Sequence, residues 1–142
     1  MATEITRSIR YLLDELVQGV PGVVGALVSS VDGFALASNT LLEPPTADAR
    51  TTDDAGLAAM SAAVLGVSNR LVGVVGREPV QEVTLRSPSG HVLVYRIANV
   101  AALTVLTDAS IDVEHVKVVS RVVTDGIDRL LCDAPSLASS SI

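Results

Sequence analysis

A run of 26 residues, Asp53 to Glu78, has the composition of one long helix built from small and apolar side chains. No charged residue occurs between Asp54 and Arg70. A helix that is apolar all round has no face suited to water, so it must be covered on two sides. In a short chain, one side can pack on the protein's own sheet and the other against a second copy. The run therefore favours an assembly protein over an enzyme.

The composition predicts one domain with an aliphatic core. The 142 residues are enough to bury such a core without disulfides or metals, and they include two Tyr, one Phe and no Trp. The net charge of −6 argues against nucleic acid, whose binding needs clustered Lys and Arg, and against an anionic membrane surface. Neither nucleic acid nor a membrane is therefore an expected partner.

The single cysteine, Cys132, cannot form an intramolecular disulfide and fits a reducing cytoplasm. The first ten residues lack the apolar segment of a signal peptide. The uncharged run over 55–69 is too short and too rich in Ser, Gly and Ala to cross about 30 Å of hydrocarbon. We therefore expect a cytoplasmic protein without membrane insertion.

Hydrophobic periodicity and turn residues predict three helices and five strands. Ile9, Leu13 and Leu16 recur at helical spacing, and Gly19 and Pro21 then end that helix. The expected helices cover 4–19, 53–78 and a last segment that starts after Asp108 or Ser110 and ends at Ala134-Pro135. The expected strands cover 23–31, 34–38, 80–86, 91–97 and 100–107. The apolar stripe of the last helix is expected to hold Ile111, His115, Val118, Val119, Val122, Val123, Ile127 and Leu130 or Leu131.

Two reversals and one long loop complete the pattern. Asp32-Gly33 predicts a hairpin with a type I′ turn, which needs positive φ at both central residues. Ala98 resists positive φ, so Ala98-Asn99 is expected to form a type I turn with a bulge. The 39–52 segment is long for a loop within a compact domain, which favours a mobile or functional loop.

The element order α-β-β-α-β-β-β-α predicts an α+β fold, an α/β/α sandwich around a central five-stranded antiparallel sheet. The domain is expected to span 1–134. The Ser-rich segment 135–142 is expected to be a disordered tail.

Motifs that carry chemistry are not found in the sequence. It contains no GxxxxGK[ST], HExxH, CxxC or GxSxG pattern, so neither a P-loop nor a zinc site is expected. His91 and His115 are few for acid–base catalysis, and Asp53 and Asp54 are better explained as complements to a helix dipole. We therefore expect no catalytic residues, no metal site and no cofactor.

Several arginines are expected at the surface: Arg50, Arg70, Arg77, Arg86 and Arg96. Arg70 interrupts the uncharged helix, where it could pair with a partner's acidic surface or lie along the helix edge. The spacing singles out none of them as a catalytic arginine finger.

The chain resembles the Roadblock/LC7 family over about residues 4–133. The resemblance is carried by the element order, the Leu12-Leu13-Asp14-Glu15-Leu16 helix, the Val20-Pro21-Gly22-Val23 entry to the first strand, the hairpin at Ala26–Phe34 and the small-residue central helix. The 39–52 loop is longer than is usual for the family, and Tyr95–Asn99 lacks the Gly-containing reversal of bacterial members. The acidic charge and Ala/Val bias look like actinobacterial members found beside small Ras-like GTPases.

The resemblance implies a profilin-like fold and a homodimer, in which the central helices of two copies pack together and the third strands join into one sheet. The residues agree, because the larger side chains of the helix form one seam and the small ones occupy the rest. We assign the small-residue side to the second copy. The larger seam is Leu57, Met60, Val64, Val67, Leu71 and Val74. The predicted dimer interface is Ala55, Ala58, Ala59, Ala62, Ala63, Gly66, Val80, Glu82 and Thr84.

Three functions follow from this hypothesis. The first is a non-enzymatic regulatory subunit that dimerises and docks a Ras-like GTPase, with docking around Asn69, Arg70, Arg77 and the 39–52 loop. Members of the family can activate such GTPases by biasing their switch regions. The second is a scaffold for a signalling complex, such as one with a sensor-kinase-like partner, without effect on GTP hydrolysis. The third is a small-ligand sensor, which the aliphatic composition disfavours.

Overall fold

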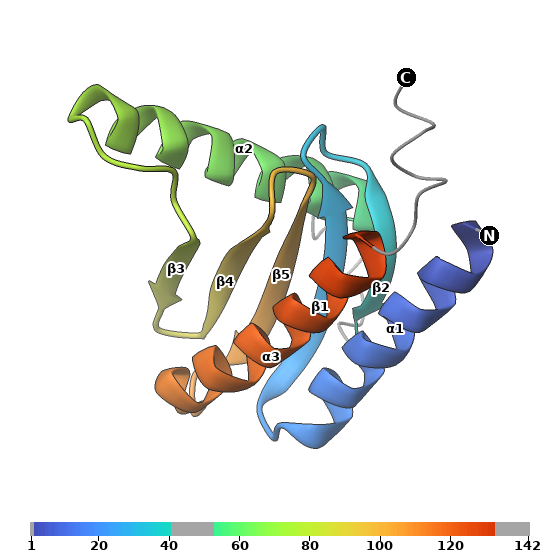
Figure 1. Ribbon diagram of the computed structural model, residues 1–142. Helices are drawn as coiled ribbons and strands as arrows, with labels where there is room; N and C mark the ends of the chain where they lie inside the picture. Colours follow the sequence, from blue (N-terminus) through green and yellow to red (C-terminus); the bar gives the residue numbers. More distant parts are fainter. Residues whose placement is uncertain (1, 41–52, 133–142) are drawn as a thin grey trace.

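The structure, a computed structural model, describes residues 2–40 and 53–132 (Figure 1). The predicted element order is confirmed. The helices are α1 (Ala2–Gly19), α2 (Asp54–Val74) and α3 (Val113–Cys132). The strands are β1 (Val23–Ser30), β2 (Ala35–Thr40), β3 (Glu82–Ser87), β4 (Gly90–Ile97) and β5 (Ala101–Asp108).

The strands form one antiparallel sheet in the order β2-β1-β5-β4-β3, as expected for the α+β sandwich. Helices α1 and α3 cover one face and α2 lies on the other (Figure 1). The central strand β5 is buried from Ala101 to Thr107, which explains its almost wholly apolar sequence. The edges of the sheet are β2 and β3.

The main hydrophobic core lies between the sheet and the α1–α3 layer. Its large side chains come from both helices and from the strands beneath them. Those that are almost fully buried include Ile9, Leu13, Leu16, Leu93, Ile97, Leu103, Val105, Val116 and Ile127. Burial of such side chains supplies most of the free energy that stabilises a domain of this size.

The core on the α2 face is smaller and is built from smaller side chains. Ala58, Ser61 and Leu65 are the buried residues of α2. Leu65 packs with Val94 of the sheet, and the Ser61 hydroxyl accepts a 2.7 Å hydrogen bond from buried Thr104. The helix begins at an Asp53 cap, whose carboxylate accepts from the Gly56 amide, as the acidic start predicted.

The predicted β1–β2 hairpin is confirmed, but its turn is not type I′. A type I′ turn would need positive φ at both Asp32 and Gly33, but only Gly33 of the two has it, at 92°. Ser30 accepts a hydrogen bond from the Gly33 amide and donates one to Phe34, which defines a three-residue loop with glycine in the left-handed position. A Cβ at Gly33 would lie 3.2 Å from Cα of Ala59, so this turn also brings α2 close to the sheet.

Three further expectations are corrected. Ala98 adopts φ of 50°, so the expected type I turn without positive φ at this alanine is wrong. Helix α2 ends at Val74 rather than Glu78. Helix α3 begins at Val113, just after Asp112, whose carboxylate accepts a hydrogen bond from the Glu114 amide. Asn39 and Thr40, which were expected in the 39–52 loop, belong to β2. The remaining residues of that expected loop, 41–52, and the expected tail, 135–142, lie outside the described residues.

Candidate interaction surface

The outward side of α2 carries large apolar side chains that the rest of the chain does not cover. Met60, Val67, Leu71 and Val74 are 52%, 65%, 68% and 85% exposed. We call these four residues, with Ala59, Ala63 and Gly66 beside them, the outer face of α2. Exposed apolar side chains gathered on one face of a helix are typical of an interaction site.

This burial corrects the predicted division of the helix. The small-residue side was assigned to a second copy, yet Ala58 is fully buried against the chain's own sheet and Ala62 is half-buried. Small side chains allow the helix to approach the sheet closely, as the contact between Gly33 and Ala59 shows. Of the larger seam, Met60, Val67, Leu71 and Val74 consequently face outward, whereas Leu57 and Val64 are half-buried. Ala58 therefore leaves the candidate interface, and the four outward-facing residues of the larger seam join it.

The other small residues of the predicted interface remain accessible. Ala55, Ala59, Ala63 and Gly66 are exposed, and a Cβ built at Gly66 would meet no atom within 4 Å. These positions leave room for a second helix to approach the α2 backbone closely. The three- and four-residue spacing had grouped Met60, Val67, Leu71 and Val74 into one seam, but the small-residue side was assigned to the interface in its place.

Strand β3 supplies a second part of the candidate surface, because it is a free edge. Val80, Glu82 and Thr84, which were predicted at the dimer interface, are half-buried on this edge strand and its approach. The register of β3 with β4 is regular from Glu82 to Ser87. An uninterrupted edge of this kind offers unpaired amides to another strand.

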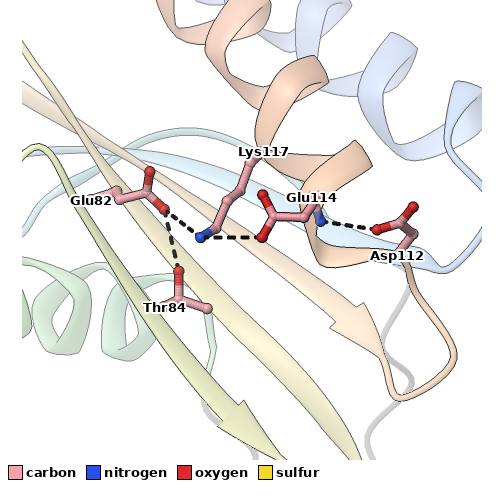
Figure 2. Close-up of polar contacts among 5 residues, drawn as sticks. All are labelled: Glu82, Thr84, Asp112, Glu114 and Lys117. Atoms are coloured by element: carbon pink, nitrogen blue, oxygen red, sulfur yellow. Dashed lines mark hydrogen bonds and ion pairs between the residues drawn. The ribbon is translucent and has the colours of Figure 1, made fainter.

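A small polar network joins β3 to the start of α3 (Figure 2). Lys117 Nζ lies 3.4 Å from Glu82 Oε2 and 4.0 Å from Glu114 Oε1. Thr84 donates to the same Glu82 oxygen at 3.3 Å. The network fixes the Glu82 side chain on the α3 side of the sheet, although a partly exposed ion pair contributes at most about 1 kcal/mol to stability.

The three predicted docking residues have different environments. The Asn69 side-chain oxygen accepts a 2.8 Å hydrogen bond from the Val80 amide, so this residue positions the segment between α2 and β3. Arg70 and Arg77 are exposed and form no ion pair with the described residues. The two arginines remain available to an acidic partner, whereas Asn69 already has a structural role.

The other polar groups do not assemble into a catalytic site. His91 Nδ1 accepts from the Ser87 amide in the β3–β4 turn, and His115 is exposed on α3. Within 2–40 and 53–132, no three His, Cys, Asp or Glu side chains are placed to hold a metal ion. Burial raises the pKa of Tyr95 from 10.0 to about 12, so its phenol stays protonated into the alkaline range.

A polar hollow of about 390 Å³ lies between α3 and the β3–β4 edge. Its lining includes Glu82, Tyr95, Arg121 and Asp125. The Tyr95 hydroxyl is buried and has no hydrogen-bond partner among the described residues. The hollow is the feature that would suit a small polar ligand, although the aliphatic composition disfavoured a small-ligand sensor.

Among the described helices, α2 is the one whose length and composition would allow it to cross a membrane. Its inner side is engaged with the sheet through Ala58, Ser61 and Leu65. In this structure α2 is therefore a layer of the domain.

The sequence model of the Roadblock/LC7 domain family matches residues 9–107. This match spans more than half of the chain, so the protein belongs to the Roadblock/LC7 family. Members of this family are regulatory and adaptor domains. No protein with curated annotation is detectably similar in sequence.

Solved structures share the fold at low identity. Myxococcus xanthus MglB superposes with a TM-score of 0.78 at 12% identity, covering 90% of each chain. A Roadblock/LC7 domain from Streptomyces avermitilis gives 0.73 at 19% identity, covering 87% of this chain and 97% of that one. Acanthamoeba castellanii profilin IA gives 0.55 at 17% identity, covering 85% and 97%. The profilin-like Roadblock/LC7 architecture predicted from the sequence is confirmed.

Proposed function

We propose that this protein is a cytoplasmic, non-enzymatic regulatory or scaffolding subunit that forms a homodimer and binds a small Ras-like GTPase. The observation that carries the proposal is the exposed outer face of α2. Helix α2 packs on the sheet with small residues and presents Met60, Val67, Leu71 and Val74 to its surroundings. Water is a poor environment for that surface, so a protein partner is the expected cover.

A second copy of the same chain is the simplest partner for the outer face of α2. An isologous contact needs one self-complementary patch, and apolar side chains that alternate with Ala63 and Gly66 provide bulges and hollows on one helix. A pair of such helices together with an edge strand would reach a standard interface of about 1,600 Å². The free β3 edge lies beside α2 and supplies that strand.

The GTPase partner is proposed from membership of the Roadblock/LC7 family and from the resemblance to members encoded beside Ras-like GTPases. Arg70 and Arg77, at the end of α2 and just beyond it, are exposed cations without ion pairs in the described chain. They are suited to acidic side chains on a GTPase. Such a dimer would act by favouring one arrangement of the switch segments, without inserting a catalytic residue.

The test uses the full chain and a small Ras-like GTPase encoded beside it. We expect the two proteins to co-elute and the rate of GTP hydrolysis to change. The double variant Arg70→Glu with Arg77→Glu should weaken GTPase binding about a hundredfold, because both positions would then repel the acidic side chains of the GTPase. Arg10→Glu, on exposed α1, is the matched control and should bind normally. Absence of both binding and any rate change would contradict the GTPase proposal.

The runner-up function is a scaffold that assembles a signalling complex and leaves GTP turnover unchanged. It uses the same outer face of α2 and the same dimer. Complex formation with an unaltered hydrolysis rate would favour this scaffold. A thermal-shift response to a small polar metabolite, abolished by Tyr95→Phe, would instead favour a sensor that uses the hollow beside α3.

A further inference from the structure

We infer that the β3 strands of two copies pair antiparallel about Thr84, with Glu82 of each chain opposite the partner's Arg86. The inference rests on the proposed homodimer and adds its register, which that proposal leaves open. It follows from the direction of the β3 amides, from the charges on the strand and from the position of α2.

The hydrogen-bond pattern of β3 determines which amides are free. The Arg96 amide donates to the Gln81 carbonyl at 2.9 Å, which marks Gln81 and Arg96 as a hydrogen-bonded pair of the β3–β4 ladder. Such pairs alternate along an antiparallel ladder, so Val83 and Leu85 also bond to β4. The amide and carbonyl groups of Glu82, Thr84 and Arg86 therefore point outward from the sheet.

The free amides limit the registers open to a second β3. Residues opposite each other in an antiparallel ladder share the same bonding state, so Glu82, Thr84 and Arg86 must face one another. Centring the pair on Glu82 or Arg86 opposes like charges, which is unfavourable. Centring it on Val83 or Leu85 leaves both Glu82 and Arg86 without an opposite charge. The register centred on Thr84 pairs both charges with opposite charges.

The side chains on both faces agree with this register. Glu82, Thr84 and Arg86 lie on the α3 side of the sheet, and their partners there would form two ion pairs around a central pair of threonines. Both side-chain contacts of Glu82 within the described residues use Oε2, which leaves Oε1 for a second cation. Arg86 is exposed and has no ion pair within the described residues.

On the opposite face, the register places Val83 against the partner's Leu85. Leu85 is 46% exposed in the single chain, so pairing would cover it. Figure 1 shows the C-terminal end of α2 extending beyond β3, past the edge of the sheet. This extension carries Leu71 and Val74, which a second sheet joined at β3 would cover. The overhang is independent of the strand charges and indicates the same neighbour.

Cysteine cross-linking tests the register directly. In a Cys132→Ser background, the Thr84→Cys protein should form disulfide-linked dimers under mild oxidation, because residues in a hydrogen-bonded pair lie about 5.5 Å apart at Cα. Val83→Cys and Leu85→Cys are the matched controls and should stay unlinked on their own. A mixture of Glu82→Cys and Arg86→Cys proteins should link to each other more than either links to itself.

The other possible cross-linking results overturn different parts of the inference: the register, the strand pairing or the homodimer. Self-linking at Val83→Cys or Leu85→Cys in place of Thr84→Cys overturns the register while the homodimer stands. A dimer by light scattering with no link at any of these positions overturns strand pairing and leaves a dimer held by α2. A monomeric chain overturns the homodimer and the register together.

Charge reversal gives a second readout that does not depend on cysteine. Glu82→Arg and Arg86→Glu should each raise the dimer dissociation constant about tenfold, since each opposes like charges at two symmetric positions. The double variant should recover most of the loss. Lys117→Met removes the contacts with Glu82 and Glu114 inside the chain and should leave dimerisation within about twofold. A double variant no better than the single variants overturns the ion-pair register.

Discussion

The two faces of the sheet are built differently. On the α1–α3 face, large side chains such as Leu13, Leu103 and Ile127 are fully buried between the layers. On the α2 face, the contact is made by Ala58, Ser61 and Leu65, and the bulk of the helix lies outward. The difference separates two tasks along one chain. The α1–α3 face stabilises the single domain, and the α2 face keeps apolar surface for assembly.

Exposed valines on α3 show that apolar exposure alone does not define an assembly surface. Val118 and Val122 are each 66% exposed, nearly the same as Val67 on α2. On α3 they stand beside Lys117 and Arg121, whereas α2 carries no charge between Asp54 and Arg70. The charges keep water close to the α3 valines. What distinguishes the outer face of α2 from the exposed valines of α3 is therefore the absence of charged residues among its apolar side chains between Asp54 and Arg70.

The largest effect on stability should come from the α1–α3 face. Leu103→Ala removes a fully buried side chain from the central strand and should lower the free energy of unfolding by about 3 kcal/mol, measured by urea denaturation. Leu36→Ala, on partly exposed β2, should cost less than about 1 kcal/mol. Equal losses at the two positions would contradict the assignment of the main core to this face.

The next effect should be on assembly. Val67→Glu places a charge on the outer face of α2 and should raise the dimer dissociation constant at least about a hundredfold, with the monomer still folded by circular dichroism. Val122→Glu makes the same change at the same exposure on α3 and should leave dimerisation unaltered. Sedimentation across a dilution series measures both. Similar behaviour of the two variants would remove the distinction between the faces.

Much of the fold follows from local patterns in the sequence. Three helices, five strands and their order were predicted, because each segment has clear periodicity and is bounded by turn residues such as Gly19, Pro21 and Gly33. The turn conformations were less predictable. Ala98 takes a positive φ because the β4–β5 reversal imposes it, and no local propensity of alanine indicates that conformation.

The interaction surface was predicted only in part, for a physical reason. The uncharged run identified α2, but alanine and leucine are both apolar, so hydropathy does not tell which side faces the sheet. That choice depends on two tertiary contacts, the approach of Ala59 to Gly33 and the hydrogen bond of Ser61 with Thr104. Valines on several sides of α3 produced the same ambiguity, and the predicted stripe held His115, Val118 and Val122 although all three are exposed.

A smaller effect should come from the hydrogen bond that seats α2. Ser61→Ala leaves the buried Thr104 hydroxyl without its acceptor and should cost about 1–2 kcal/mol of unfolding free energy. The double variant Ser61→Ala with Thr104→Val should be less destabilised than the sum of the single variants, because both polar groups are then removed. Strict additivity would show that the bond does not hold α2 on the sheet.

The smallest effect at neutral pH concerns Tyr95, which lies on the well-packed face. Burial raises its pKa to about 12, above the unfolded value of 10.0, and a hydrogen bond to the Glu15 carboxylate raises the pKa of exposed Tyr11. A raised pKa in the folded state means that the phenol's contribution to stability is complete below pH 10 and is lost as the pH rises toward 12. Phenolate absorbance should therefore show Tyr95 ionising last.

Two variants separate the tyrosines in that titration. Tyr95→Phe should remove the later ionisation and flatten the dependence of unfolding free energy on pH above 10, whereas Tyr11→Phe should leave the later ionisation in place. Coincident ionisation of both residues near the ordinary value would mean that water reaches the Tyr95 hydroxyl freely. The α3 side of β4 would then be open rather than packed, and the contrast between the two faces would be weaker than the burial of Leu93 and Leu103 implies.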